Sequence, residues 1–135
     1  MTATNETPTL DDPARTERVG TALAGRLRDK GITAVVCWDD SEDAVVAHVV
    51  ARELGVGLRL AEEIEGIVTL ERPLPENAVV ALVAEELTAR TAVAGLAGVV
   101  RHSGARVAAV ATARTTAVVA ETEAADATVL TAEDA

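Results

Sequence analysis

Short apolar runs alternate with amphipathic segments along this chain. Three continuous apolar runs have strand length: 32–38 (ITAVVCW), 79–83 (VVALV) and 106–113 (RVAAVATA). Unbroken apolar runs of this kind are typical of parallel strands that are covered on both faces. Between them, apolar residues recur at helical spacing in three segments: 13–31, 44–54 and 93–101. The pattern therefore predicts strand–helix units that follow an initial helix.

Capping residues set the expected helix ends. Asp12 followed by Pro13 is a typical helix start, and Gly31 is a typical end. Asp40 or Ser41 can cap the second helix, which Gly55 ends, and Gly104 closes the third. Four further elements have weaker patterns: a strand at 56–60, a hairpin or flap within 61–78, a helix at 115–124 and a strand at 127–130.

The order of elements predicts a single-domain α/β fold, with a mostly parallel sheet and helices on both faces. We expect residues 1–11 to form a flexible N-terminal arm and residues 12–135 to form the domain. In such folds ligands bind beyond the carboxyl ends of the strands. Two polar segments occupy that position here, CWDDSED at 37–43 and AEELTARTA at 84–92.

Composition narrows the classes of function. The 135 residues carry a formal net charge of −10 and contain one aromatic side chain, Trp38. A nucleic-acid partner is not expected, because such binding depends on Lys and Arg that neutralise phosphates. No apolar run approaches the roughly 18 residues of a membrane span, and no basic segment precedes an apolar one at the N-terminus. We therefore expect a cytoplasmic protein without a membrane partner.

The stretch VVALVAEELTARTAVAGLAGVVRHSGARVAAVATA resembles the core of the type I phosphoribosyltransferases. The upstream stretch ITAVVCWDDSEDAVVAHVVARELGVGLRL looks like the preceding strand–loop–helix unit of that family. Together the two stretches span roughly residues 32 to 113, which is most of the chain. The resemblance implies the type I phosphoribosyltransferase fold.

The resemblance also implies roles for individual residues. Glu85 and Glu86 take the place of two acidic residues that contact ribose hydroxyls, if the loop is one or two residues shorter than usual. Without a gap, Ala84 and Glu85 fill those two places. Thr88, Arg90 and Thr91 then match a loop that cradles the sugar 5′-phosphate with the following helix N-terminus. The alternative is an ordinary strand-to-helix turn with solvated acids and a threonine cap.

Two departures from the family pattern bear on activity. Ala89 stands where the phosphate loop has glycine, and the upstream turn at 38–43 is acidic and lacks glycine. A diphosphate would be repelled there unless Mg²⁺, held by Asp39 and Asp40, bridged the charges. One interpretation is a degenerate phosphoribosyltransferase-like protein, a non-catalytic binding, regulatory or assembly module. The alternative is a Mg²⁺-dependent phosphoribosyltransferase, or an enzyme acting on another small phosphorylated ligand. The departures favour the non-catalytic interpretation.

The remaining candidates have simpler interpretations. We expect Cys37 to be a buried apolar residue, because nearby acids oppose thiolate formation. Trp38 is expected at a pocket wall or a subunit interface, and the two histidines have no predicted chemistry. A homodimer is expected, and three valines are candidates for the subunit contact: Val49, Val50 and Val99.

Overall fold

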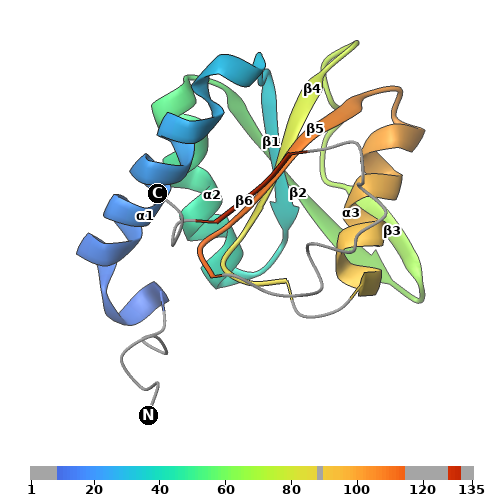
Figure 1. Cartoon of the computed structure of the whole chain (residues 1–135). Helices are drawn as coiled ribbons and strands as arrows, with labels where there is room; N and C mark the ends of the chain where they lie inside the picture. Colours follow the sequence, from blue (N-terminus) through green and yellow to red (C-terminus); the bar gives the residue numbers. More distant parts are fainter. Residues whose placement is uncertain (1–8, 88–89, 115–127, 132–135) are drawn as a thin grey trace.

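A six-stranded sheet forms the centre of the molecule (Figure 1). The computed structural model describes residues 9–87, 90–114 and 128–131. The sheet has the order β3-β2-β1-β4-β5-β6, and β3 alone is antiparallel to its neighbour. Its strands are β1 (Ala34–Trp38), β2 (Gly57–Ile64), β3 (Ile67–Leu70), β4 (Val79–Ala84), β5 (Arg106–Thr112) and β6 (Thr128–Thr131). The predicted mostly parallel sheet is confirmed.

Helices cover both faces of this sheet, as the strand–helix alternation predicted (Figure 1). They are α1 (Pro13–Leu27), α2 (Ser41–Leu54) and α3 (Arg90–His102), with two short 3-10 turns, η2 (Thr9–Asp11) and η3 (Arg28–Lys30). Helices α1 and α2 pack together over one face, while α3 packs on the other. No described helix is long and apolar enough to cross a bilayer.

Side-chain caps fix the ends of the helices. The Asp12 carboxylate accepts a hydrogen bond from the Arg15 backbone N–H at 3.0 Å, and Pro13 opens α1. The Asp40 carboxylate caps α2 by accepting from the Glu42 and Asp43 backbone N–H groups. The α-helical part of α1 is shorter than predicted, because its last turn tightens into η3 before Gly31 at φ 71°.

Each face of the sheet has its own apolar core. On one side the core contains Leu23 and Leu27 of α1, and on the other it contains Leu96 of α3. Val49 and Val50 are only 2% and 0% exposed, so their predicted role in a subunit contact is wrong. The reason is that α1 lies over α2 and buries the face that the sequence pattern left open. Val99 is half-buried against the α3-side core, and the homodimer itself stays a prediction.

The segment at 61–78 contains the hairpin that its pattern indicated. Strand β2 continues past its predicted end to Ile64 and pairs with β3 through a two-residue turn at Glu65 and Gly66. Both turn residues have positive φ, 52° and 82°, as a type I′ hairpin turn requires.

Three predictions concern the ends of the chain. Strand β6 begins one residue later than predicted, at Thr128. Residues 9–11 of the predicted flexible arm form the turn η2, which contacts α2. The predicted helix at 115–124 lies outside the described residues, as does the rest of the predicted arm.

Candidate functional site

The carboxyl ends of β1 and β4 lie side by side and open into an acidic pocket. Strands β1 and β4 are adjacent and parallel, so the segments that follow them emerge at the same edge of the sheet. A cavity of about 250 Å³ lies there. Carboxylate residues line it: Asp40, Glu42, Asp43, Glu85 and Glu86. A cavity therefore lies where the crevice was predicted, its described wall carries negative charge, and ligand binding there stays a prediction.

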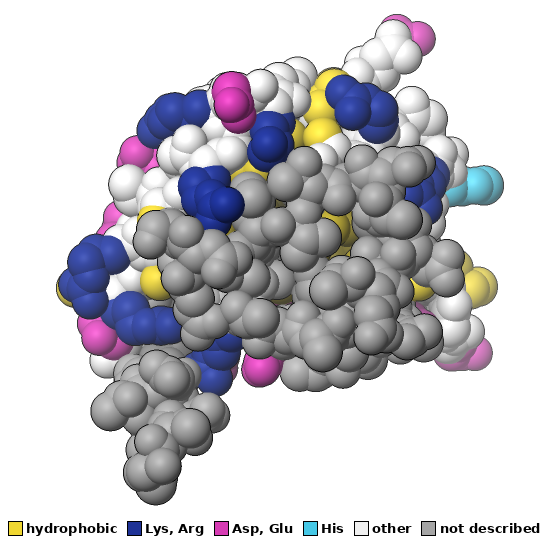
Figure 2. Space-filling view, viewed as in Figure 1, with side chains coloured by type: hydrophobic (Ala, Val, Ile, Leu, Met, Phe, Trp, Pro, Cys, Tyr) yellow, Lys and Arg dark blue, Asp and Glu magenta, His cyan; other side chains and the backbone are white. Residues whose placement is uncertain are grey.

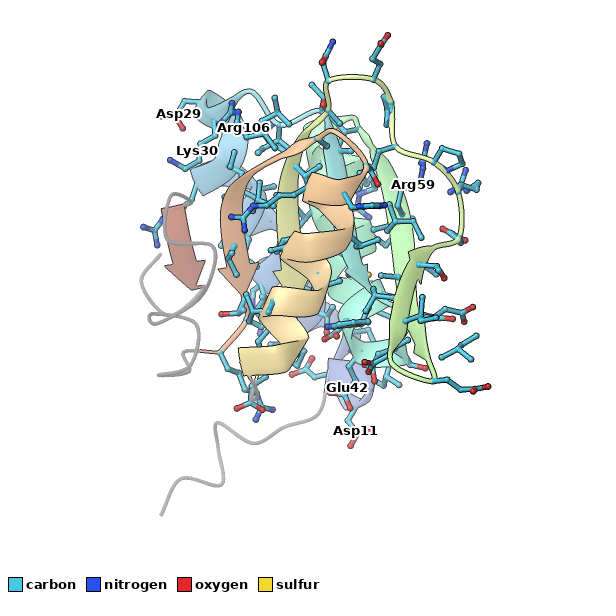
Figure 3. The ribbon with its side chains drawn as sticks, turned by 90° about the vertical axis from the view of Figure 1, so that its right-hand side faces the viewer. Asp11, Asp29, Lys30, Glu42, Arg59 and Arg106 are labelled. Carbon is cyan, nitrogen blue, oxygen red and sulfur yellow. The ribbon has the colours of Figure 1, made fainter. Side chains whose placement is uncertain are left out.

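Charge is distributed unevenly over the molecule. Figure 3 shows Glu42 and Asp11 at one end of the sheet, while Asp29 lies with Lys30, Arg106 and Arg59 toward the opposite end. Lys and Arg side chains are also prominent on the face that carries α1 (Figure 2). The described carboxylates of the pocket wall repel free phosphates.

Asp43 joins α2 to the end of β4. Its Oδ1 accepts a hydrogen bond of 2.8 Å from the Glu85 backbone N–H, although the two residues are 42 positions apart. The residue is 8% exposed. Burial raises the pKa of the Asp43 carboxyl to about 6, and repulsion from Asp40, Glu85 and Glu42 adds to the shift. The Glu85 hydrogen bond opposes the shift, since it stabilises the ionised form.

Glu85 lines the pocket, but it is largely buried and paired with a cation. It is 5% exposed, and its Oε2 accepts a 2.8 Å hydrogen bond from Arg114 Nε. The Arg114 backbone N–H also donates to the Glu85 carbonyl at 3.0 Å. Glu86 is exposed and lines the pocket. The two acids of the predicted pair therefore have different environments.

Sequence reasoning considered Asp43 only as one of four clustered acids that could hold a hard cation, and it did not name Arg114. Asp43 was one of several acids in a helix-capping turn, and Arg114 followed the last clear strand. Their partner, Glu85, is distant from both along the chain. Only the adjacency of β1, β4 and β5 brings the three together.

The predicted phosphate cradle is only partly within the described region. Thr88 lies outside it, while Arg90 and Thr91 form the start of α3, with side chains that are not described. Helix α3 does begin just after the end of β4, where the resemblance places an anion-binding helix terminus. Phosphate binding by Thr88, Arg90 and Thr91 stays a prediction.

The predicted metal ligands lie at the start of α2. Asp40 uses its Oδ1 to cap that helix, and Asp39 is exposed and donates its backbone N–H to the Ala61 carbonyl. Within the described ranges, no group of three or more His, Cys, Asp or Glu side chains is arranged to hold a metal ion. Magnesium binding by Asp39 and Asp40 stays a prediction.

Two further candidates of the sequence analysis, Cys37 and Trp38, lie at the end of β1. Cys37 is fully buried, and burial raises the pKa of its thiol to about 12, with added repulsion from Asp43 and Asp39. Its predicted role as a buried apolar residue is confirmed. Trp38 is half-buried and its indole Nε1 donates to the Ala92 carbonyl at 3.2 Å. This hydrogen bond links the end of β1 to the first turn of α3.

Solved structures share this architecture. Adenine phosphoribosyltransferase from Thermoanaerobacter pseudethanolicus superimposes with a TM-score of 0.76 at 17% identity, covering 93% of this chain and 83% of that one. The Rhodothermus marinus adenine enzyme gives 0.71 at 14%, with coverages of 93% and 82%. Orotate phosphoribosyltransferase from Aeropyrum pernix gives 0.70 at 17%, with 92% and 73%. No family model or curated protein matches the sequence. The chain has the type I phosphoribosyltransferase fold.

Proposed function

We propose that this chain is a phosphoribosyltransferase-fold protein that does not transfer phosphoribose and acts as a non-catalytic binding, regulatory or assembly module. The observation that carries the proposal is the acidic pocket at the carboxyl ends of β1 and β4. A sugar diphosphate approaching this wall meets carboxylates. Two unit charges 4 Å apart repel by about 4 kcal/mol at an effective dielectric constant near 20.

The environment of Glu85 supports the same proposal. A carboxylate that is to bind ribose hydroxyls needs lone pairs that face the ligand. Glu85 is almost fully buried, and one of its carboxylate oxygens accepts a 2.8 Å hydrogen bond from Arg114 Nε. Freeing that carboxylate would leave Arg114 without this partner in a largely buried position, which is costly. Glu86 is the acid of the pair that remains exposed at the pocket.

A turnover assay tests the proposal directly. The purified chain is incubated with 5-phosphoribosyl-1-diphosphate and Mg²⁺, and with adenine or orotate in separate reactions. We expect no release of diphosphate, and no heat of binding by calorimetry for the sugar diphosphate with or without Mg²⁺. Diphosphate release that depends on the added base would overturn the proposal.

A second candidate is an active, Mg²⁺-dependent phosphoribosyltransferase. The observation that favours it is the position of Glu85 and Glu86, directly between β4 and the start of α3. In this candidate a nitrogen of the base would attack the sugar C1 as the C1–O bond to diphosphate breaks, the bonding electron pair would stay on the departing diphosphate oxygen, and the base nitrogen would lose its proton to solvent. A Mg²⁺ held by Asp39 and Asp40 would neutralise the charge of the diphosphate. A related form of this candidate acts on another small phosphorylated ligand.

Substitutions at the loop distinguish the two candidates. If the chain is an enzyme, Glu85→Ala and Arg90→Ala abolish the binding of a sugar phosphate in calorimetry. Glu76→Ala and Arg18→Ala are matched controls, because both residues are exposed and neither lines the pocket. Equal binding by all four variants would reject the site assignment of the second candidate.

A further inference from the structure

The outer edge of the sheet, at β3, is open. Strand β3 is last in the strand order, and no strand among the described residues pairs with its second side. Figure 1 shows β3 at the periphery of the molecule, beyond β2. An open strand edge presents backbone N–H and C=O groups that can pair with another extended segment.

The hairpin register identifies which backbone groups point outward. The two-residue turn places Ile64 and Ile67 in the hydrogen-bonded pair that closes the hairpin. Along an antiparallel ladder, hydrogen-bonded pairs alternate with non-hydrogen-bonded pairs, whose N–H and C=O groups point away from the partner strand. The Glu71 N–H donates to the Leu60 carbonyl at 2.9 Å, as this alternation requires. The positions between them, Val68 and Leu70, therefore direct their N–H and C=O groups to the open edge.

Apolar side chains lie exposed beside this edge. Ile64 and Ile67, which are opposite one another across the hairpin, are 58% and 66% exposed. Together with Glu65 and Thr69 they line a cavity of about 320 Å³. The other face of β3 is covered by the protein itself, since Val68 packs against the α3-side core. Strand β3 also contains no Lys, Pro or bulge, the features that protect edge strands from pairing.

Charge on the hairpin decides what kind of segment fits this edge. Glu62 lies on the same face of the hairpin as Ile64 and Ile67, Glu63 lies on the opposite face, and Glu65 is in the turn. No Lys or Arg occurs between Arg59 and Arg72, which flank the hairpin. A second copy that paired through the same hairpin would bring two sets of carboxylates together. A segment with basic side chains would instead gain attraction, and its apolar side chains could cover Ile64 and Ile67.

We propose that β3 is a docking edge for an extended segment of a partner protein that alternates apolar and basic residues. The segment adds to the sheet as a seventh strand, with main-chain hydrogen bonds to Val68 and Leu70. Its apolar side chains lie on the face of Ile67 and Ile64, and its basic side chains lie on the opposite face, which carries Glu63. This inference is independent of whether the acidic pocket binds or transforms a ligand.

A peptide-binding experiment on the full chain tests the inference. The probe is a fluorescein-labelled ten-residue peptide of alternating valine and lysine, and the control probe alternates valine and glutamate. We expect saturable anisotropy changes with the lysine peptide only, weakening as salt is raised. Equal binding of the glutamate peptide, or no binding of the lysine peptide at low salt, would overturn the inference.

Variants of the edge separate strand addition from loose charge attraction. Val68→Pro removes an outward N–H and is expected to weaken lysine-peptide binding at least tenfold, whereas Val68→Ala keeps the N–H and most of the affinity. Ile67→Ser provides a second test that needs no proline, because it removes the exposed apolar contact without changing the charge of the hairpin. Binding unchanged by both Val68→Pro and Ile67→Ser would refute docking at β3. Light scattering completes the test, since a dimer that Val68→Pro dissociates would identify a second copy as the occupant instead.

Discussion

Replacing Asp43 with asparagine should stabilise this protein at neutral pH and leave it unchanged in acid. Asparagine is nearly isosteric with aspartate, and its side-chain carbonyl can still accept the hydrogen bond from the Glu85 backbone N–H. The new amide group would face a pocket lined by carboxylates such as Asp40 and Glu42. The substitution therefore removes a buried charge while it keeps the contact between α2 and β4.

The size of the effect follows from the pKa of Asp43. In the folded chain the pKa is raised from 3.8 to about 6, chiefly by burial. Between these two pH values the unfolded chain has lost the proton while the folded chain retains it, so stability falls as pH rises. A shift of about two units, at roughly 1.4 kcal/mol per unit, corresponds to about 3 kcal/mol. That penalty is complete above about pH 6.5 and absent below about pH 3.5.

Urea unfolding of the two proteins across a range of about pH 3.5 to 8 measures this difference. Other carboxylates titrate in both proteins, so they largely cancel when the two free energies of unfolding are subtracted. We expect the advantage of Asp43→Asn to grow from near zero to about 3 kcal/mol over that range. Asp43→Ala is the control, because it removes the charge together with the acceptor and leaves the Glu85 N–H unsatisfied. A pH-independent difference, or an Asp43→Asn protein that is less stable in mildly alkaline buffer, would refute the reasoning.

Three further predictions concern other parts of the chain. Arg114→Gln removes the cation that lies 2.8 Å from the buried Glu85 carboxylate, and it should lower the free energy of unfolding by about 3 kcal/mol. A change below about 1 kcal/mol in urea titration would contradict this. A Cβ at Gly20 would clash with Val49 of α2, so Gly20→Ala should destabilise by about 1–3 kcal/mol. The same substitution at Gly25 meets nothing within 4 Å and should stabilise the helix slightly, as thermal melts would show. Cys37, with a pKa of about 12, should react with a thiol reagent near neutral pH only after unfolding; rapid reaction of the native chain would disagree.

Much of the fold could be predicted from local patterns. The runs at 32–38, 79–83 and 106–113 indicated buried parallel strands, because a strand covered on both faces needs apolar side chains on both. The caps at Asp12 and Asp40 form as predicted, since an N-cap depends only on residues within one turn. The ends of strands with weak patterns were predicted less exactly. Strand β2 extends to Ile64, because its last residues pair with β1 and β3 although their apolar and polar side chains do not alternate regularly.

The sequence by itself determined the α/β class, the position of the crevice and its acidity, because these depend on short-range patterns and on the order of strands. The tertiary structure decided which charged groups are buried and which are paired. Asp43, Glu85 and Arg114 follow three separate strands, and only the adjacency of those strands makes one acid a buried acceptor and pairs another with a cation. It also decided that α1 buries Val49, and that no described strand pairs with the outer side of β3, where Ile67 is exposed. Contacts between distant segments set desolvation and pairing energies, and no local pattern contains them.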